Sequence, residues 1–184
     1  MKSTLIIVAV IALLAIWFIA SYNKLVRLNI SADESFAQIE VQLKRRADLI
    51  PNLVETVKGY ASHEKTTLDA VISARAKATS ATGIADVAAA DGQLTTALRG
   101  LLAVAESYPD LKASANFLSL QEELSTTENK VAFARQFYND TVRSLNQAVK
   151  TFPSGLFAGV AKVSARAFYE IENAADRNVP NVKF

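Results

Sequence analysis

The residues of this chain best suited to catalysis or metal binding are its single histidine, His63, and the adjacent Glu64. A His-Glu pair on a helix, followed by a second histidine four residues after the first, binds zinc in metalloproteases. Here that position is Thr67, so a metal at His63 would need Asp or Glu for all its other protein ligands. His63 also lacks a nearby serine in a strand-to-helix elbow. We expect an exposed surface histidine and rank a hydrolase or metal enzyme as the least favoured function.

The acidic residues do not complete a metal motif. Di-metal helical bundles use Glu-x-x-His on two helices, which one histidine cannot supply. Glu122, Glu123 and Glu128 are expected on the solvated face of a long helix, some of them paired with Lys130 or Arg135. The sequence contains no Gly-rich phosphate-binding loop and no cysteine. It therefore predicts a non-enzyme with no catalytic residue, metal ligand, cofactor or small-molecule substrate.

Lys44, Arg45 and Arg46 form the one basic run. The run begins about 20 residues after an apolar N-terminal segment, which along a rigid helix is some 30 Å. That exceeds the Debye length of about 8–10 Å, so contact with lipid headgroups requires the helix to tilt or bend back. The alternatives are contact with a partner protein and internal pairing with carboxylates such as Asp110 or Glu106. We take Lys44, Arg45 and Arg46 as candidate lipid or partner contacts.

The elements that must position these residues begin with a membrane-type segment. No charged residue lies between Lys2 and Lys24. The uncharged stretch reaches roughly 31 Å as a helix, close to the thickness of the hydrocarbon core. Trp17 and Tyr22 lie toward its C-terminal end, as expected at a headgroup boundary. The small residues that signal-peptidase cleavage requires are poorly placed, so we expect residues 1–23 to be a retained transmembrane anchor rather than a removable signal peptide.

Charge and length limit the partners and the number of domains that residues 24–184 can have. The net charge of +2 does not favour nucleic acid as a partner, and the residues after the anchor suffice for one domain. Basic residues are slightly more numerous after the anchor than before it, which favours a cytoplasmic domain and leaves a periplasmic one open.

Helical periodicity dominates the rest of the chain. Apolar residues recur at three- and four-residue steps from Phe36 to Val71, from Val87 to Val104 and from Phe117 to Phe152. Pro51 predicts a kink or a break with a restart at Asn52. Helices with one apolar stripe can bury it only against one another. We therefore predict an all-α fold: the transmembrane helix, then an antiparallel, up-and-down bundle of three to four long helices, with coiled-coil-like packing, over residues 24–153. Residues 154–184 are expected to form a short amphipathic helix and a tail. The stretch 156–171 could cap the bundle, contact a neighbouring subunit or lie on the membrane, and capping is the favoured alternative.

Several longer motifs resemble those of the LemA family. They are residues 42–64 (QLKRRADLIPNLVETVKGYASHE), 103–112 (AVAESYPDLK), 120–129 (LQEELSTTEN), 152–154 (FPS) and the closing 179–184 (VPNVKF). The sequence departs from the family pattern at Phe36, where Trp is usual, and at Ser114 and Gly155, where Asn is common. The resemblance implies a single-pass, membrane-anchored helical bundle of the bacterial inner membrane, and it implies no reaction.

Two functional hypotheses follow. The favoured one is a non-enzymatic interaction or scaffold protein, possibly self-assembling, whose long helical faces bind a protein partner or further copies of the chain. The alternative is a lipid-surface or membrane-stress module that senses the bilayer through residues 44–46 and 156–171.

Overall fold

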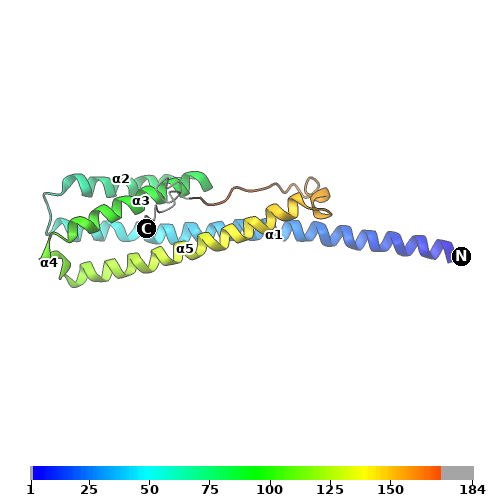
Figure 1. Ribbon diagram of the computed structural model, residues 1–184, viewed down its shortest axis with the longest axis horizontal. Coiled ribbons are helices and arrows are strands. Elements are labelled where there is room, and N and C mark those ends of the chain that lie inside the picture. The colour runs from blue at the N-terminus through cyan, green and yellow to red at the C-terminus, as the bar shows by residue number, and fades with distance from the viewer. Residues whose placement is uncertain (1, 171–184) are drawn as a thin grey trace, which may run out of the picture. The chain divides into compact units, whose positions relative to one another are not determined.

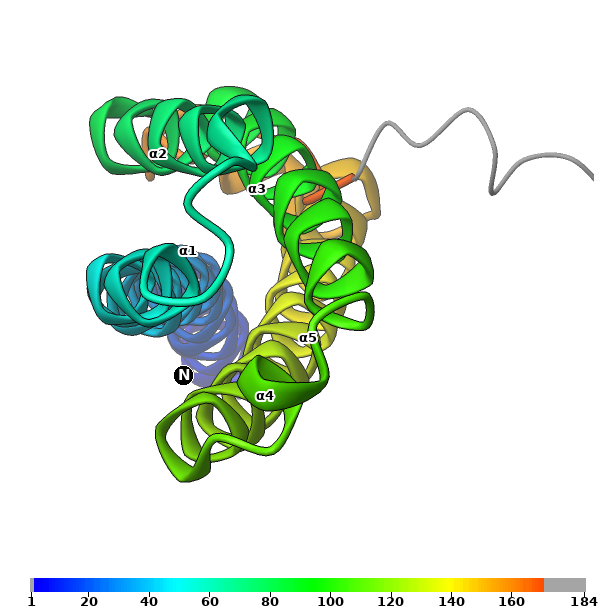
Figure 2. The ribbon, with the colours of Figure 1, turned by 90° about the vertical axis from the view of Figure 1, so that its left-hand side faces the viewer.

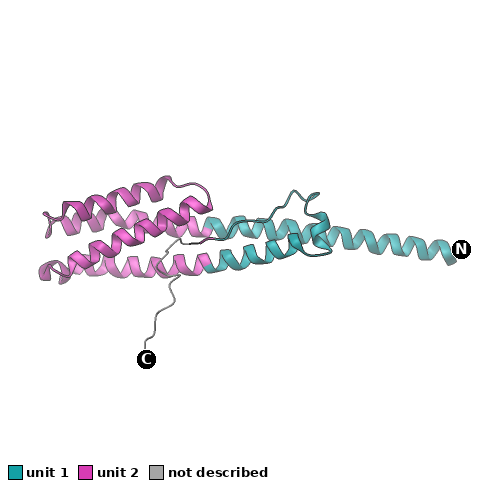
Figure 3. Ribbon diagram, turned by 45° about the horizontal axis from the view of Figure 1, so that its top comes forward, with its two compact units in different colours: residues 1–37, 136–168 teal, residues 38–135, 169–184 magenta. Residues whose placement is uncertain are grey.

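The computed structural model describes residues 2–170 and is helical in almost all of them. Within that range there is no β-strand. The elements in order are α1 (Lys2–Lys58), α2 (Lys65–Ser80), α3 (Ile84–Ala105), α4 (Pro109–Lys112), α5 (Ala115–Lys150) and a 3₁₀ turn, η1 (Ser154–Phe157), as labelled in Figure 1. The described chain divides into two compact units (Figure 3). Unit 1 comprises residues 2–37 and 136–168, and unit 2 comprises residues 38–135 with Tyr169 and Glu170.

Unit 1 contains the apolar N-terminal part of α1. Its large side chains, from Leu5 to Ile19, are exposed. By length and composition α1 is the one described helix that could cross a membrane. Apolar side chains on all sides of a helix, most of them uncovered by protein, are typical of a segment solvated by lipid. The predicted all-α fold with a candidate membrane-spanning helix at its N-terminus is confirmed.

The segment after α5 in unit 1 does not form the expected amphipathic helix. It makes one 3₁₀ turn, η1, and residues 163–170 have no helical structure. Side chains of α5 bind its backbone instead: Asn146 accepts a hydrogen bond from the Arg166 N–H and donates one to the Arg166 carbonyl, at 2.8 and 2.9 Å. The Tyr138 hydroxyl donates to the Ala167 carbonyl at 2.9 Å. These bonds satisfy backbone groups that a helix would otherwise pair internally. Residues 171–184 of the predicted tail lie outside the described residues.

Unit 2 is the helical bundle. The C-terminal part of α1 runs beside α2, α3 and the first half of α5 (Figure 2). Apolar side chains from these four helices form one core. The core contains Ile50, Leu53, Val54 and Val57 from α1, Leu68 and Val71 from α2, Leu94, Leu98 and Leu101 from α3, and Phe117 and Leu124 from α5. Burial of these side chains is the main stabilising contribution, at about 25 cal/mol per Å² of apolar surface. The predicted packing of stripe against stripe is therefore correct.

Pro51 does not break α1, so of the kink and the break expected from the sequence, the break with a restart at Asn52 is wrong. The helix runs from Lys2 to Lys58 with Pro51 inside it. A proline cannot donate to the carbonyl four residues earlier, which here belongs to Ala47. That carbonyl accepts a hydrogen bond from Nε of Arg75 on α2, at 2.8 Å. A neighbouring helix thus satisfies the backbone group that proline leaves free.

The chain turns at Gly59 instead. Residues 59–64 join α1 to α2, and the Ala61 N–H bonds back to the Val57 carbonyl at 2.8 Å. The apolar stripe expected to continue to Val71 therefore belongs to two helices that pack on each other. The next link reverses the chain between α2 and α3 and includes Gly83 at φ +82°, a left-handed conformation that favours glycine.

Candidate functional site

The most unusual feature of unit 2 is an ion pair inside the bundle. Arg46 on α1 is 2% exposed and Asp91 on α3 is 1% exposed. One terminal nitrogen of the Arg46 guanidinium donates to Asp91 Oδ1 at 3.0 Å and to Thr95 Oγ1 at 2.9 Å. The other terminal nitrogen lies 3.5 Å from a carboxylate oxygen of Glu128 on α5. A charge-assisted hydrogen bond removed from water in this way is stronger than a surface pair.

Two further groups contact the second oxygen of Asp91. The Tyr169 hydroxyl donates to Asp91 Oδ2 at 3.2 Å, and the Arg135 guanidinium of α5 lies 3.8 Å from the same oxygen. That guanidinium also lies 5.7 Å from the centre of the Tyr169 ring, a cation–π distance. Burial, and then the negative charge of Asp91, raise the pKa of Tyr169, so the hydroxyl stays protonated at neutral pH and can donate. We call Arg46, Asp91, Glu128, Arg135 and Tyr169 the buried polar cluster.

The sequence signal for this cluster is a charged residue within an apolar stripe. Asp91 lies four residues after Val87 and three before Leu94, so it points into the core that these two residues line. Arg46 occupies the corresponding gap in the stripe of α1. Arg46 was predicted only as part of the basic run, and Asp91 was not predicted as a site residue.

The cluster is suited to holding segments together rather than to catalysis. Its two arginines and two carboxylates balance in charge, and its tyrosine is a neutral donor. Each oxygen of Asp91 already has a partner, so the carboxylate is poorly placed to act as a base or nucleophile. The cluster links α1, α3, α5 and the segment that carries Tyr169. Fixing the register of packed helices is the best-attested role of buried polar groups.

The three candidate contact residues lie in different environments. Arg46 is buried in the cluster, and it pairs with Asp91 and Glu128 rather than with Asp110 or Glu106. Arg45 is exposed. Lys44 is also exposed and forms a surface ion pair with Asp48 one helical turn later, at 3.0 Å. An outward contact with lipid or a partner would therefore use Lys44 and Arg45.

His63 and Glu64 lie in the turn between α1 and α2. His63 is exposed, as the sequence predicts, and Glu64 accepts a hydrogen bond from the Tyr108 hydroxyl at 3.2 Å. Glu122 and Glu123 are exposed, whereas Glu128 pairs with Arg46 instead of Lys130 or Arg135. Across residues 2–170 no three His, Asp or Glu side chains gather closely enough to hold a metal ion.

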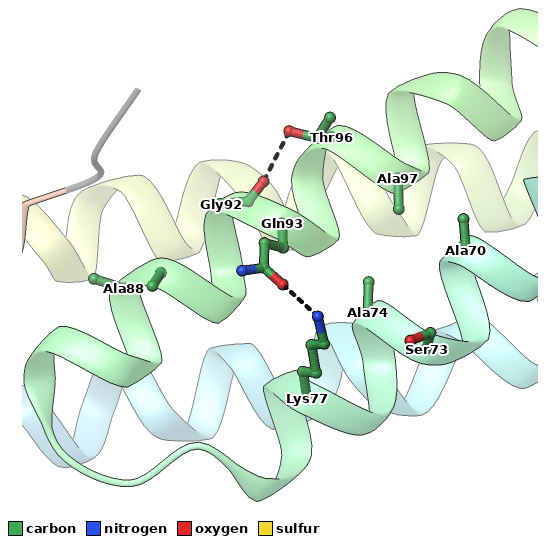
Figure 4. Close-up of a pocket in the computed structure, with 10 residues that line it drawn as sticks. Ala70, Ser73, Ala74, Lys77, Ala88, Gly92, Gln93, Thr96 and Ala97 are labelled. Carbon is green, nitrogen blue, oxygen red and sulfur yellow. Dashed lines mark hydrogen bonds between the residues drawn. The ribbon is translucent and has the colours of Figure 1, made fainter. Parts of the chain in front are cut away.

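A shallow groove of about 560 Å³ runs between α2 and α3 (Figure 4). Small side chains form most of its lining, and Lys77 of α2 donates to the Gln93 amide oxygen of α3 at 3.2 Å. Ala70, Ser73, Ala74, Ala88, Ala89, Gly92, Thr96 and Ala97 complete the lining. The groove therefore offers a shape into which a side chain could fit, and it contains no acid–base pair.

The fold and the buried cluster define an all-helical, membrane-associated bundle. The model of the LemA family matches residues 35–184, and the chain belongs to this family.

Two sets of relatives are distant. Protein LemA of Metamycoplasma hominis is 26% identical over 136 residues, a match that spans 73% of this chain and 62% of that protein. The magnetosome proteins MamQ 1 and MamQ 2 of Paramagnetospirillum magneticum are each 22% identical over 202 residues, spanning 94% of this chain and 74% of theirs.

Proposed function

We propose that this protein is a single-pass protein of the bacterial cytoplasmic membrane whose helical bundle is a non-enzymatic scaffold. In this proposal residues 1–23 hold it in the lipid and the bundle lies on the cytoplasmic side, following the excess of basic residues after the anchor. The bundle binds other proteins or further copies of the same chain. Membership of the LemA family and the apolar N-terminal part of α1 support the membrane association.

The observation that carries the scaffold proposal is an aromatic side chain on the outside of the bundle. Phe133 on α5 is 72% exposed, although the same helix directs Arg135 toward the buried cluster. Phe137, one turn further along α5, is exposed as well. Burying a phenylalanine in a protein interface stabilises the complex by about 1.5–3 kcal/mol, and aromatic residues are enriched at interface centres.

Lys44 and Arg45 add a second contribution. Both are exposed in unit 2, and charges at the rim of an interface steer partners of opposite charge more than they add affinity. We therefore propose that they select an acidic protein surface, while Phe133 supplies the affinity.

Photo-crosslinking in cells tests the scaffold proposal. A photoreactive phenylalanine analogue at position 133 should capture a neighbour of defined mass, either a second copy of the chain or another protein. The matched control places the same analogue at Asp69, an exposed residue of α2, and should capture far less. Phe133→Gln should then shift the full chain to a smaller species in mild detergent. Equal capture at both positions, together with an unchanged species for Phe133→Gln, would refute the proposal.

A further inference from the structure

The loop that follows α5 lies against the apolar part of α1. The Phe157 ring lies 4.9 Å from the Phe18 ring and 5.5 Å from the Trp17 ring, both edge to face, and the Phe152 ring lies 6.3 Å from Trp17. Further along, Ala158 packs with Leu25 and Ala148 in a small core of unit 1. Phe152 and Phe157 therefore lie at the level of Trp17 on the helix that we propose enters the bilayer, and Ala158 lies at the level of Leu25.

This contact places the loop deeper than the nearest charges of α1. Trp17 and Phe18 precede Lys24 by seven and six residues, which at 1.5 Å per residue is about 9–10 Å along the helix axis. If Lys24 lies at the headgroups, Phe157 lies within the apolar boundary of the bilayer. Interfacial apolar groups of peripheral segments reach a similar depth, about 5–10 Å.

The composition of the loop fits that depth. Residues 151–161 (TFPSGLFAGVA) contain no charged residue, and Lys150 and Lys162 flank them on either side. Three of the apolar side chains point away from the protein: Phe152, Leu156 and Val160 are 78%, 67% and 64% exposed. Lysines at the ends of an apolar segment can extend their ammonium groups to the headgroups.

Hydrogen bonds within the protein also satisfy several backbone groups of the loop, as an environment with little water requires. Non-helical backbone at membrane depth is tolerated only when its polar groups are satisfied. Gly155 donates to the Thr151 carbonyl at 2.8 Å, Ala161 to Phe157 at 2.9 Å and Val163 to Ala158 at 3.0 Å. The Ser154 hydroxyl donates to the Ala148 carbonyl at 2.8 Å, which satisfies an acceptor near the end of α5.

We propose that residues 151–161 form a second membrane contact, in which Phe152 and Leu156 insert into the acyl chains of the same leaflet beside Trp17, while Val160 lies closer to the headgroups. The occupant of this exposed apolar surface is lipid, because the surface continues directly from the exposed apolar side chains of α1. The inference rests on the proposed anchoring of α1. It adds that unit 1 contacts the bilayer at two points, through α1 and through residues 151–161.

The experiment uses the full chain reconstituted in phosphatidylcholine vesicles. Because the chain has no cysteine, Leu156→Cys introduces a single site for an environment-sensitive fluorophore. Lipids carrying a quencher at a shallow acyl position should remove most of its emission, and iodide in the water should have little effect. The matched control is Leu118→Cys, another exposed leucine, in unit 2, which should show the reverse.

Trp17 is the only tryptophan, so its own fluorescence separates the two proposals. Quenching of Trp17 by brominated lipid, together with a Leu156→Cys label that behaves like the Leu118→Cys label, would overturn the loop insertion and leave the anchor standing. Efficient disulfide cross-linking of Leu156→Cys between copies, without lipid quenching, would assign the surface to a second chain and also overturn it. Failure of lipid to quench Trp17 would overturn both proposals.

Discussion

Asp91→Asn is expected to be among the most destabilising isosteric changes in unit 2. The substitution keeps the shape of the side chain and removes its charge, leaving Arg46 buried with Glu128 as its remaining carboxylate, 3.5 Å away. Removing one partner of a buried ion pair costs about 3–5 kcal/mol, because the other charge stays out of water without compensation. For a chain of this size, that loss lowers the unfolding temperature by about 6–20 °C, at about 2–4 °C per kcal/mol.

The chain supplies a matched control. Asp140 pairs with Arg143 at 3.0 Å, the same distance as the Arg46–Asp91 contact, but both side chains are more than half exposed. Asp140→Asn should therefore cost less than about 1 kcal/mol, the usual worth of a surface pair. With equal distances, the comparison tests burial together with the contacts to Tyr169 and Arg135 that only Asp91 makes.

A double variant separates the charge from the packing. Replacing Arg46 by Met and Asp91 by Leu removes both ions, and apolar replacements of buried pairs are often neutral or stabilising by about 1–4 kcal/mol. We expect the double variant to be clearly more stable than Asp91→Asn, with Glu128 solvated because it is half exposed. The assay is chemical unfolding of the full chain in mild detergent, followed by far-UV circular dichroism. An Asp91→Asn loss no larger than that of Asp140→Asn would refute the reasoning.

Two further predictions concern contacts that tie distant segments together. Burial raises the pKa of Tyr169 above its usual value of 10.0, so above pH 10 the folded state retains a proton that the unfolded state loses, and the free energy of unfolding should fall as the pH rises. When the free energy of unfolding is measured against pH, Tyr169→Phe should show a smaller alkaline decline than the unchanged chain. An identical slope would contradict this prediction. Arg75→Met should lower the free energy of unfolding by about 1.5–3 kcal/mol, because the Ala47 carbonyl loses its hydrogen-bond donor. The loss should be smaller in a Pro51→Ala background, where the new N–H can bond that carbonyl. Additive losses in a double-mutant cycle would show that Arg75 does not compensate for the proline.

The sequence predicted the helices well where their signal is local. The stripe from Phe117 to Phe152 corresponds to α5, Ala115–Lys150, and the stripe from Val87 to Val104 corresponds to α3, Ile84–Ala105. Both signals arise from neighbours three and four residues apart, which any helix brings together. The errors occur where a distant residue intervenes. At Pro51 a kink or a break in α1 was expected, and the bond from Arg75, 28 residues away from the Ala47 carbonyl, explains why the helix does not break.

The segment after α5 shows the same limit. Its apolar pattern predicted a helix, but the backbone of Arg166 bonds to the side chain of Asn146, 20 residues earlier. A periodic pattern records which residues could form a face and carries no information about competing side-chain partners. Phe152 and Phe157 were visible in the sequence, but their position beside Trp17 was not.

By itself, the amino-acid sequence determined the membrane-type segment and the helical bundle, and it contains no recognisable catalytic motif. Each of these follows from composition or from spacing within one helix. Tertiary structure alone decided which charges are buried and with whom. Arg46 and Asp91 are 45 residues apart, and they meet only because α1 and α3 pack in one particular register. That packing removes Arg46 from water and makes it part of the core, while Lys44 and Arg45 beside it remain exposed to water.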